Sequence, residues 1–496
     1  MNAAKRAFAH WIERPDAGAP RVRWGGGAWT QARFAARVRH YADVLAREDA
    51  QVVASRLDNG PEWIALDLAI RLLDRVHVPL PTFFSPAQVA HALADSGADA
   101  LVTPAGATVA SLAHATLDEA ATLHRFAPTP VALPPGTATI TYTSGTTGAP
   151  KGVCLGADAL LAVATSLAEA TAPLAPRRHL CLMPLSTLLE NVAGVYAALL
   201  ADAEIVAPPL AEIGYTGAAG LDVPTLLACL HRYRPESAIL VPQLLLALVM
   251  AGERGAPPPA SLKCLAVGGG RVGPALIARA EALGLPVYEG YGLSECASVV
   301  CFNRPGAVRP GSVGRPLAHA RVRVHDGELY VDGPHFLGYL GGDAVPADAG
   351  IATGDLGHID ADGFVHVTGR RKHVFITAFG RNVSPEWVET ALLQHPAFAQ
   401  AVVHGEARPF NVAIVWPRDP ALDDAALRRA LDAVNRDLPD YARVGDVIRA
   451  DAPFTAADGL LTANGRPRRD AILARYRDAM DARYAETTPH PGESFA

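Results

Sequence analysis

Short apolar runs alternate with helix-period patterns over roughly the first 130 residues. Apolar positions recurring every three or four residues predict amphipathic helices, and β-branched runs predict strands between them. The predicted helices cover 35–46 and 61–74, and the predicted strands cover 51–55, 76–79 and 98–103. Ser85 followed by Pro86 predicts another helix start, because proline is favoured at the first helical position. Such strand–helix–strand repetition indicates a mostly parallel sheet covered on both faces.

The later part of the chain continues the same alternation and then changes character. A helix is predicted at 158–170 and a strand at 262–267, and after about residue 375 a helix at 385–393 precedes strands at 399–404 and 411–416. At 496 residues the chain exceeds what one hydrophobic core organises, so two or more domains are expected.

Composition narrows the class of protein. Hydrophobic residues make up 50% and charged residues 19%, with 44 glycines and 40 prolines, as in a globular protein rather than a disordered one. The formal net charge of −6 gives no electrostatic reason to expect a nucleic-acid partner. Six scattered cysteines form no CxxC pair, which favours buried thiols in a reducing compartment over zinc.

No stretch of the sequence predicts export or membrane insertion. The first sixteen residues lack an apolar signal core. The most apolar run, 238–252, is interrupted by Pro242 and Gln243 and falls short of the roughly 20 residues that span a bilayer. A cytoplasmic location without a membrane span is the expectation.

One stretch stands out chemically, the segment TITYTSGTTGAPKG at 139–152. Its glycines let backbone N–H groups converge on an anion, its hydroxyls add donors, and Lys151 adds mobile positive charge. It differs from the ordinary P-loop because Lys151 follows Pro150 and precedes Gly152. For an isolated cluster the plain alternative is a polar turn. The candidate polyphosphate ligands are Thr143, Ser144, Gly145, Thr146, Thr147, Gly148 and Lys151.

Further motifs follow in a fixed order. They are YEGYGLSE at 288–295, TGD at 353–355 and GRRKH at 369–373. Together with the 139–152 segment they resemble the signatures of the adenylate-forming superfamily: acyl-CoA synthetases, luciferases and peptide-synthetase adenylation domains. The resemblance implies an α/β fold with a large N-terminal domain of mostly parallel, helix-covered sheets plus a β-rich subdomain. It also implies a small mobile α+β C-terminal lid. The implied boundaries are 1–370, a hinge at 371–374, and 375–496.

The resemblance also assigns roles to residues. Glu295, with Thr143, would hold Mg²⁺, which prefers oxygen ligands and substrate phosphates. Asp355 would accept hydrogen bonds from ribose hydroxyls, and Arg370 would contact ribose or phosphate. The remaining nucleotide-binding candidates are Gly268, Gly269, Gly270, Glu289, Gly290, Tyr291, Gly292 and Ser294. Taken singly, the carboxylates could be surface or turn residues and the glycines plain turns.

Three positions depart from the family pattern. Arg466 stands where the family carries its catalytic lysine. It keeps the positive charge, but its guanidinium group is wider than an ammonium group and its side chain has a different length. It either does the lysine's work with altered geometry, or adenylation is slow. Thr187 replaces a histidine in PLSTLLE at 184–190, whose Glu190 either borders an acid-binding pocket or is a structural acceptor. His373 replaces the usual hinge aspartate, which a hinge tolerates.

The resemblance implies an ATP-dependent ligase, with Thr143, Lys151, Glu295 and Arg466 as catalytic residues. A fatty or aryl acid would become an acyl-adenylate, and the thiol of coenzyme A or of a carrier protein's phosphopantetheine would then accept the acyl group. Residues 380–382 would enter the site for that transfer. Two alternatives stay open. One is an adenylate former with another acceptor; the other is a non-catalytic or adenylation-impaired relative that serves as a nucleotide or acyl-adenylate sensor or scaffold.

Overall fold

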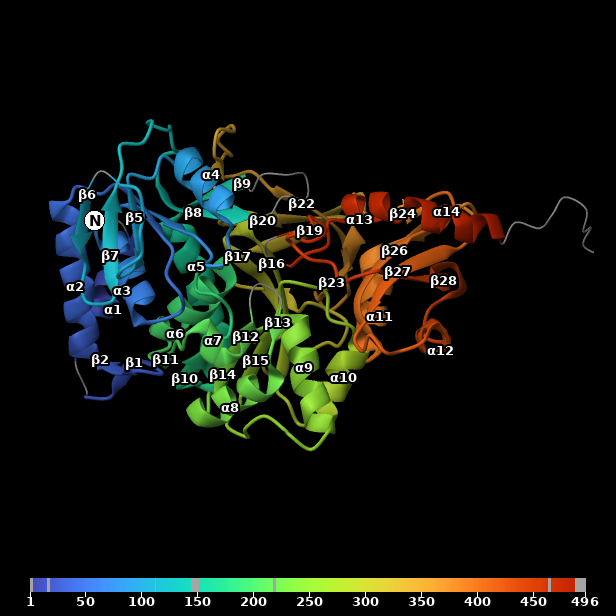
Figure 1. The fold of residues 1–496 in the computed structure, drawn as a ribbon. Helices are drawn as coiled ribbons and strands as arrows, with labels where there is room; N and C mark the ends of the chain where they lie inside the picture. The colour runs from blue at the N-terminus through green and yellow to red at the C-terminus, as the bar shows by residue number, and fades with distance from the viewer. Residues whose placement is uncertain are drawn as a thin grey trace, which may run out of the picture.

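The computed structural model describes residues 3–15, 18–111, 113–143, 151–216, 220–462 and 465–486. Figure 1 shows two large sheets with their helices toward the N-terminal end, a smaller sheet beside them, and a separate group of elements at the C-terminal end. Within the described residues, the sheets that precede residue 371 contain eight, nine, four and two strands. The α/β fold class expected from the sequence is confirmed.

The eight-stranded sheet carries the predicted strands of the first 130 residues. In spatial order its strands are β21 (Gly338–Tyr339), β9 (Lys151–Gly156), β8 (Thr137–Thr143), β4 (Val76–Pro79), β3 (Val52–Ser55), β5 (Ala100–Pro104), β7 (Ala121–Arg125) and β6 (Ala113–Thr116). Its centre is parallel, since β3 pairs in parallel with β4 and β5, and β4 with β8. The edges are antiparallel, so the sheet is mixed rather than uniformly parallel.

The nine-stranded sheet follows the same plan. Its strands in spatial order are β18 (Arg315–Pro316), β17 (Ser298–Phe302), β16 (Val287–Leu293), β15 (Cys264–Val267), β14 (Ser237–Leu240), β10 (Arg178–Leu180), β11 (Glu204–Val206), β1 (Pro20–Trp24) and β2 (Gly27–Thr30). The pairings from β1 through β16 are parallel. The carboxyl ends of parallel strands meet at one edge of a sheet, where ligands usually bind in open α/β sheets.

Helices cover these sheets, and most begin where the sequence predicts. They are α1 (Ala3–Ile12), α2 (Gln31–Arg47), α3 (Pro61–Leu72), α4 (Pro86–Ser96), α5 (Ala157–Thr171), α6 (Ala197–Leu200), α7 (Leu210–Ile213), α8 (Val223–Tyr233), α9 (Pro242–Glu253) and α10 (Pro274–Ala282). The start at Ser85 is confirmed, because its hydroxyl accepts from the backbone of Gln88 in a full capping box. A π-helical segment, η2 (Leu189–Tyr196), runs directly into α6.

Smaller elements complete the chain. The four-stranded sheet consists of β19 (Arg321–His325), β20 (Glu328–Asp332), β22 (Ile351–Ile359) and β23 (Val365–Arg370). Two short hairpins pair β12 (Tyr215–Thr216) with β13 (Gly220–Leu221), and β24 (Phe375–Ile376) with β25 (Asn382–Val383). Single turns of 3₁₀ helix are η1 (Ala172–Leu174), η3 (Ser294–Cys296) and η4 (Asp440–Ala442).

The C-terminal elements build a three-stranded sheet with helices against it. The strands are β26 (Phe398–His404), β27 (Asn411–Pro417) and β28 (Val444–Arg449), and the helices are α11 (Pro385–Gln394), α12 (Asp424–Asn435), α13 (Arg469–Arg475) and α14 (Arg477–Glu486). In Figure 1 this group lies beside α9 and α10. A turn at 371–373 separates β23 from β24, while the domain boundaries themselves stay a prediction.

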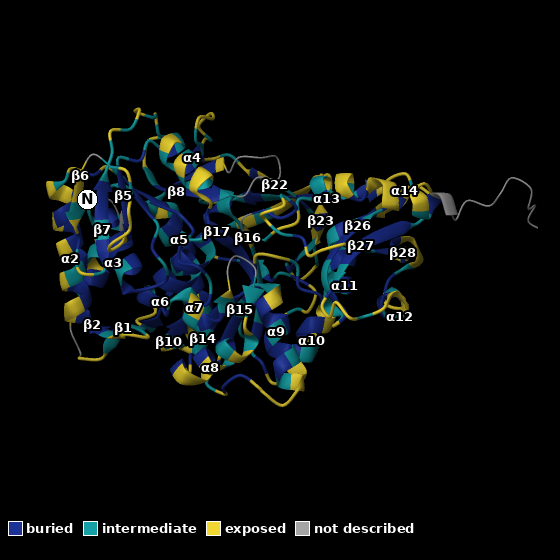
Figure 2. Cartoon of the chain, viewed as in Figure 1, coloured by how far each residue is buried: buried dark blue, intermediate teal, exposed yellow. Residues whose placement is uncertain are grey.

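The hydrophobic core follows the sheets. In Figure 2 the strands are mostly buried, and exposed residues gather on the outer faces of helices such as α2 and α14. The bulkiest buried side chains of the first core include Trp11, Trp29 and Trp63, which pack between α1, α2 and the sheets. None of the described helices is long and apolar enough to cross a bilayer.

A buried ionic network ties helix α3 to strand β8. Arg71 donates to the carbonyl of Ala138, to the hydroxyl of Thr139 and to Asp67 (3.2 Å). Asp67 also accepts from Tyr196 (2.5 Å) and from His77 (2.7 Å). Burial acts to raise the pKa of Asp67, but the charge of Arg71 and these hydrogen bonds outweigh it and lower that pKa to about 2. The network fixes the strand that leads into Thr143.

The same network contains a serine–histidine–aspartate series. Ser55 Oγ lies 2.8 Å from His77 Nε2, whose other ring nitrogen faces Asp67. An ionised carboxylate only accepts, so His77 Nδ1 carries the proton and Nε2 accepts from the serine hydroxyl. Ser55 is 0% exposed, which leaves no access for a substrate. The series is therefore structural and not a nucleophilic triad.

We expect Asp67→Ala to lower the free energy of unfolding by about 3–5 kcal/mol, because it leaves the buried Arg71 charge without its carboxylate. Urea denaturation of both proteins measures this change. The control is Asp74→Ala, which breaks an exposed ion pair with Lys5 and should cost at most about 1 kcal/mol. Equal losses in the two variants would contradict the role given to the network.

Candidate active site

A cavity of about 2380 Å³ lies between the nine-stranded sheet, the end of β8 and the C-terminal elements. Every described residue that the resemblance assigns to catalysis, nucleotide binding or magnesium lines it. They are Thr143, Lys151, Gly268, Gly269, Gly270, Glu289, Gly290, Tyr291, Gly292, Ser294, Glu295, Asp355, Arg370 and Arg466. Pockets for one small ligand usually measure 300–1,000 Å³, so this cavity has room for more than one.

The hairpin of β8 and β9 brings Thr143 opposite Lys151. The hydroxyl of Thr143 donates to the carbonyl of Lys151 at 3.5 Å. The preceding Tyr142 donates to Asp95 (2.9 Å) and so anchors the end of β8 to helix α4. The candidates Ser144, Gly145, Thr146, Thr147 and Gly148 lie outside the described residues.

Glu295 has a partner that the sequence did not reveal. The hydroxyl of Tyr339 donates to Glu295 Oε1 at 2.6 Å, and Lys151 Nζ lies 5.5 Å from the centroid of the same ring. Tyr339 reaches this place because β21 pairs with β9. Glu295 itself is only half buried, so its carboxylate stays open to the cavity. An oxygen donor in such a place fits a hydrated divalent cation such as Mg²⁺.

Asp355 lies between an aromatic ring and an arginine. Tyr291 donates to its Oδ2 at 2.7 Å, and Arg370 Nη1 lies 3.3 Å from its Oδ1. The arginine is placed by register, because Asp355 and Arg370 are paired across β22 and β23. Burial raises the pKa of Asp355, although Arg370 and Tyr291 act in the opposite direction. The two oxygens are thus held in fixed directions at the cavity wall.

Two glycines allow close backbone packing in the cavity wall formed by β15 and β16. Gly269 has φ +76°, a left-handed conformation that favours glycine, at the end of β15. At Gly292 a Cβ would lie 1.8 Å from the carbonyl oxygen of Ser298, so no side chain fits where β16 meets β17. The sequence candidate Gly292 therefore has a structural reason for its residue type.

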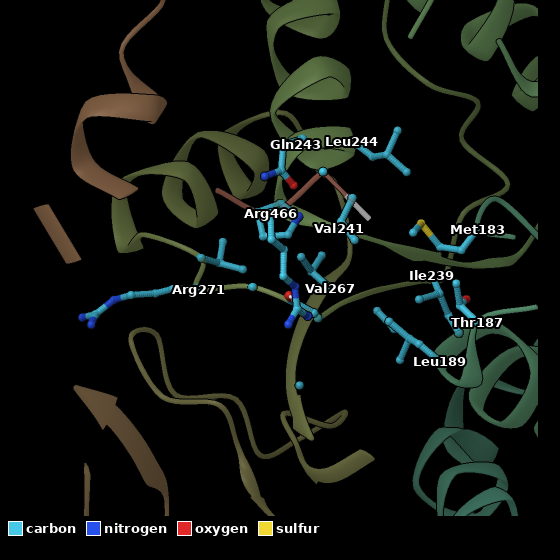
Figure 3. A pocket seen from close by; sticks show the side chains of 18 of the residues that line it. Met183, Thr187, Leu189, Ile239, Val241, Gln243, Leu244, Val267, Arg271 and Arg466 are labelled. Carbon is cyan, nitrogen blue, oxygen red and sulfur yellow. Dashed lines mark hydrogen bonds between the residues drawn. The ribbon is translucent and has the colours of Figure 1, made fainter. Parts of the chain in front are cut away.

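Arg466 reaches the cavity from the C-terminal elements. A tight turn holds its backbone, because Thr462 donates to its carbonyl (2.8 Å) and it donates to the Thr462 hydroxyl (3.1 Å). Its Nη2 donates to the carbonyl of Gly269 at 3.5 Å, and Figure 3 shows the side chain extending beside Val267. Burial within the cavity lowers the pKa of Arg466, as does Arg370.

Glu289 is the candidate with the most altered acidity. It is 8% exposed on β16, and burial raises its pKa to about 8, against the opposing effects of the Val272 backbone and Arg271. At neutral pH the side chain is therefore mostly a neutral carboxylic acid. In that form it both donates and accepts hydrogen bonds at the cavity wall.

The structure decides between the two readings of Glu190. The carboxylate is 0% exposed; it accepts from the backbone of Met183 (2.8 Å) and bonds to His179 Nε2 (2.9 Å). Cys181 lies beside them, and burial raises the pKa of its thiol. Glu190 is thus a structural acceptor. With both carboxylate oxygens already engaged, the His179–Cys181–Glu190 group is a hydrogen-bonded cluster rather than a metal centre.

The expected hinge contains a hydrogen bond to the C-terminal elements. His373 Nδ1 bonds to Glu386 on α11, and the hydroxyl of Ser384 donates to the same carboxylate at 3.2 Å. Nearby, Arg271 donates to the carbonyl of Thr368 at 3.1 Å, just before the turn. Histidine is accommodated at this position by a partner from the C-terminal elements.

Two family models match the chain. The model described as AMP-binding enzyme matches residues 8–340, and the one described as AMP-binding enzyme C-terminal domain matches residues 372–488. The long-chain-fatty-acid–CoA ligase FadD15 of Mycobacterium bovis is 29% identical, over 85% of this chain and 86% of the relative. A 2-succinylbenzoate–CoA ligase of Bacillus velezensis is 30% identical, over 76% of this chain and 78% of the relative.

Solved structures share the fold. The anthranilate CoA ligase AuaEII in complex with anthranoyl-AMP superimposes with a TM-score of 0.79 at 19% identity, covering 97% of this chain and 98% of the other. O-succinylbenzoate CoA synthetase of Bacillus subtilis, in complex with ATP and magnesium, gives 0.73 at 23% identity, covering 95% and 99%. At these identities the likeness concerns the fold alone.

The raised pKa of Glu289 predicts how the stability of the protein changes with pH. Its pKa lies at about 8 in the folded protein against an ordinary value of 4.5, so the folded state binds more protons between these two pH values. Its contribution to stability is therefore present below pH 4.5 and lost as pH rises toward about 8. Glu289→Gln should gain stability relative to the parent protein across that window and level off above it. Urea denaturation over this pH range measures the difference; a constant difference would contradict the shift.

Proposed function

The chain belongs to the AMP-binding, adenylate-forming enzyme family, and on that premise we propose that it is an AMP-forming acid–thiol ligase. It activates a fatty or aryl carboxylic acid with ATP and transfers the acyl group to a thiol, releasing AMP and pyrophosphate. One observation carries the proposal: Arg466 and Lys151 line the same cavity as the carboxylates Glu295 and Asp355. The reaction brings two anions together, and this arrangement supplies charge of both signs where it is needed.

In the first step a carboxylate oxygen of the acid attacks the α-phosphorus of ATP, and pyrophosphate leaves with the bonding electron pair. The Arg466 guanidinium offsets the charge of the incoming carboxylate and the α-phosphate, and Lys151 offsets that of the departing phosphates. Glu295 and the Thr143 hydroxyl would hold Mg²⁺, which when bound supplies further neutralisation of phosphate charge. Ser144, Gly145, Thr146, Thr147 and Gly148 belong to the proposed phosphate loop.

The nucleoside half of ATP would lie against the opposite wall. Asp355, with fixed oxygens, would accept from the ribose hydroxyls beside Arg370, and Tyr291 would present its ring to the base. The nucleotide wall would be completed by backbone or side chains at Gly268, Gly269, Gly270, Glu289, Gly290, Gly292 and Ser294.

In the second step the thiol sulfur attacks the acyl carbon, and AMP leaves with the oxygen that came from the acid. Gly380, Arg381 and Asn382 are described in the structure, and they are absent from the residues that line the cavity. A rotation about 371–374 would bring them in, with the His373–Glu386 contact at its pivot. The thiol donor is coenzyme A or a carrier protein's phosphopantetheine, and a cytoplasmic location stays part of this proposal.

AMP release tests the proposed function. Mixing the protein with ATP, Mg²⁺, a panel of acids and coenzyme A or a phosphopantetheine-loaded carrier should give AMP and a thioester with at least one acid. Chelation of Mg²⁺ should abolish AMP release, because phosphate charge is then left unneutralised. Nucleotide binding without turnover for any acid would instead favour the non-catalytic sensor, the alternative that the Arg466 and Thr187 departures motivate.

Arg466 variants test the catalytic assignment. Arg466→Ala should slow ATP–pyrophosphate exchange by on the order of 10²–10³, because one well-placed charge contact is lost. Arg466→Lys keeps the positive charge of the parent protein but carries it on an ammonium group, which is narrower than a guanidinium. A lower exchange rate in the lysine variant would show that the site is adapted to arginine, and a higher rate would show that Arg466 handicaps it.

The matched control is Arg477→Ala, which removes an exposed arginine of α14 that is not among the cavity-lining residues. Its exchange rate should match that of the parent protein. If Arg466→Ala behaved like this control, the assignment of Arg466 to the first step would be wrong.

A further inference from the structure

The cavity is polar at one end and apolar at the other. Figure 3 draws Arg466 and Gln243 toward one side of the pocket, and Met183, Thr187, Leu189 and Ile239 toward the other. The described cavity-lining residues between 179 and 250 include no Asp, Glu, Lys or Arg. A ligand that extends from Arg466 along these segments therefore meets none of their charged side chains, whereas the exposed Arg254, which directly follows α9, also lines the cavity.

The apolar end carries incompletely buried hydrophobic surface. Several aliphatic or aromatic side chains pack against the core of the nine-stranded sheet but remain only partly buried, and each lines the cavity: Met183, Leu210, Tyr215, Leu221, Leu227 and Val241. They come from three separate segments, before η2, around the β12–β13 hairpin and α8, and at the start of α9. Apolar surface facing a cavity gains free energy when an apolar ligand covers it, at about 25 cal/mol per Å².

Two polar residues of this region, Thr187 and His179, are already hydrogen-bonded within the protein. The Thr187 hydroxyl donates to the carbonyl of Pro184 at 2.7 Å, within its own turn. His179 bonds to Glu190 through Nε2 (2.9 Å) and to Ser237 through Nδ1 (3.1 Å). A charged or strongly polar group on a ligand's tail would find no free counter-charge here, and burying it would cost free energy.

Met183 is a rigid part of this wall. Its backbone N–H donates to Glu190, and its carbonyl accepts from Asn59 at 2.9 Å. Its sulfur accepts from the hydroxyl of Tyr215 at 3.5 Å, which joins the wall to the β12–β13 hairpin. The Met183 backbone is therefore anchored independently of its side chain.

We infer that the acid, in the ligase function proposed above, is a neutral-tailed aliphatic monocarboxylic acid. Its chain lies along Leu189, Ile239 and Val241, and the Met183–Tyr215 contact sets its preferred length. Leu221 and Leu227 line the same cavity, so its aliphatic lining extends to the β13 and α8 segments. We expect a dicarboxylic or amino acid to be disfavoured, because the cavity-lining segments between 179 and 250 offer no partner for a second charge.

A homologous series of straight-chain acids tests the inference on the unaltered protein. Measured by AMP release, kcat/KM should rise about threefold to fourfold with each added CH₂ until the wall is reached, and then fall. An acid of optimal length with a second carboxylate at its far end should be slower by at least on the order of 100-fold. A flat dependence on length, or a preference for the dicarboxylic acid, would overturn the inference.

Met183→Ala tests whether the Met183–Tyr215 contact sets the preferred chain length of the acid. Removing the thioether should shift the optimum to longer acids and lower the ratio of kcat/KM for the original optimum over longer chains. Met480→Ala is the matched control, since Met480 is buried in the C-terminal elements and is not among the cavity-lining residues. Its chain-length profile should equal that of the parent protein. An unchanged profile in Met183→Ala would contradict the role of this contact.

These experiments distinguish a failure of the inference about the acid's tail from a failure of the proposed ligase function. If no acid of any kind supports AMP release, the proposed ligase function fails. If an aromatic, amino or dicarboxylic acid is the best substrate, the ligase function stands and the inference about the tail is wrong.

Discussion

The repulsion between a carboxylate and a triphosphate is the constraint that the site must overcome. Positive charge has to reach the place where they meet, and here part of it comes from the C-terminal elements. Arg466 extends to the carbonyl of Gly269 on the opposite side of the cavity, in electrostatic range of Asp355 and Glu295. A site assembled from two parts of the chain forms only when those parts are together, which couples chemistry to their relative position.

Buried polar contacts far from the cavity hold the other half of the site. The Asp67–Arg71–His77 network fixes strand β8 through Ala138 and Thr139, and Tyr142 fixes its end through Asp95. A buried ion pair adds little net stability over a hydrophobic packing of the same shape, but it specifies one arrangement. In this protein that arrangement fixes the hairpin in which Lys151 lies 5.5 Å from the ring centroid of Tyr339, the hydrogen-bond partner of Glu295.

The sequence predicted the elements whose signals are local. The capped start at Ser85, strand 76–79 and the glycine run 268–270 all appear, and the motif residues line one cavity. Contacts between distant segments carried no local signal. Tyr339 meets Glu295 only because β21 pairs with β9, and His179 meets Glu190 only through the packing of η2 on the sheet. The sequence showed that Arg466 departs from the family pattern. Only the folded structure shows that its side chain reaches the carbonyl of Gly269.

The central claim is that a carboxylate oxygen attacks the α-phosphorus of ATP in this cavity. It is tested most directly by turnover of an acid labelled with ¹⁸O in its carboxyl group, followed by mass spectrometry of the AMP. The account predicts one labelled oxygen in each AMP released, because AMP departs with the bridging oxygen of the acyl-adenylate. Unlabelled AMP, or label found instead in pyrophosphate, would contradict it.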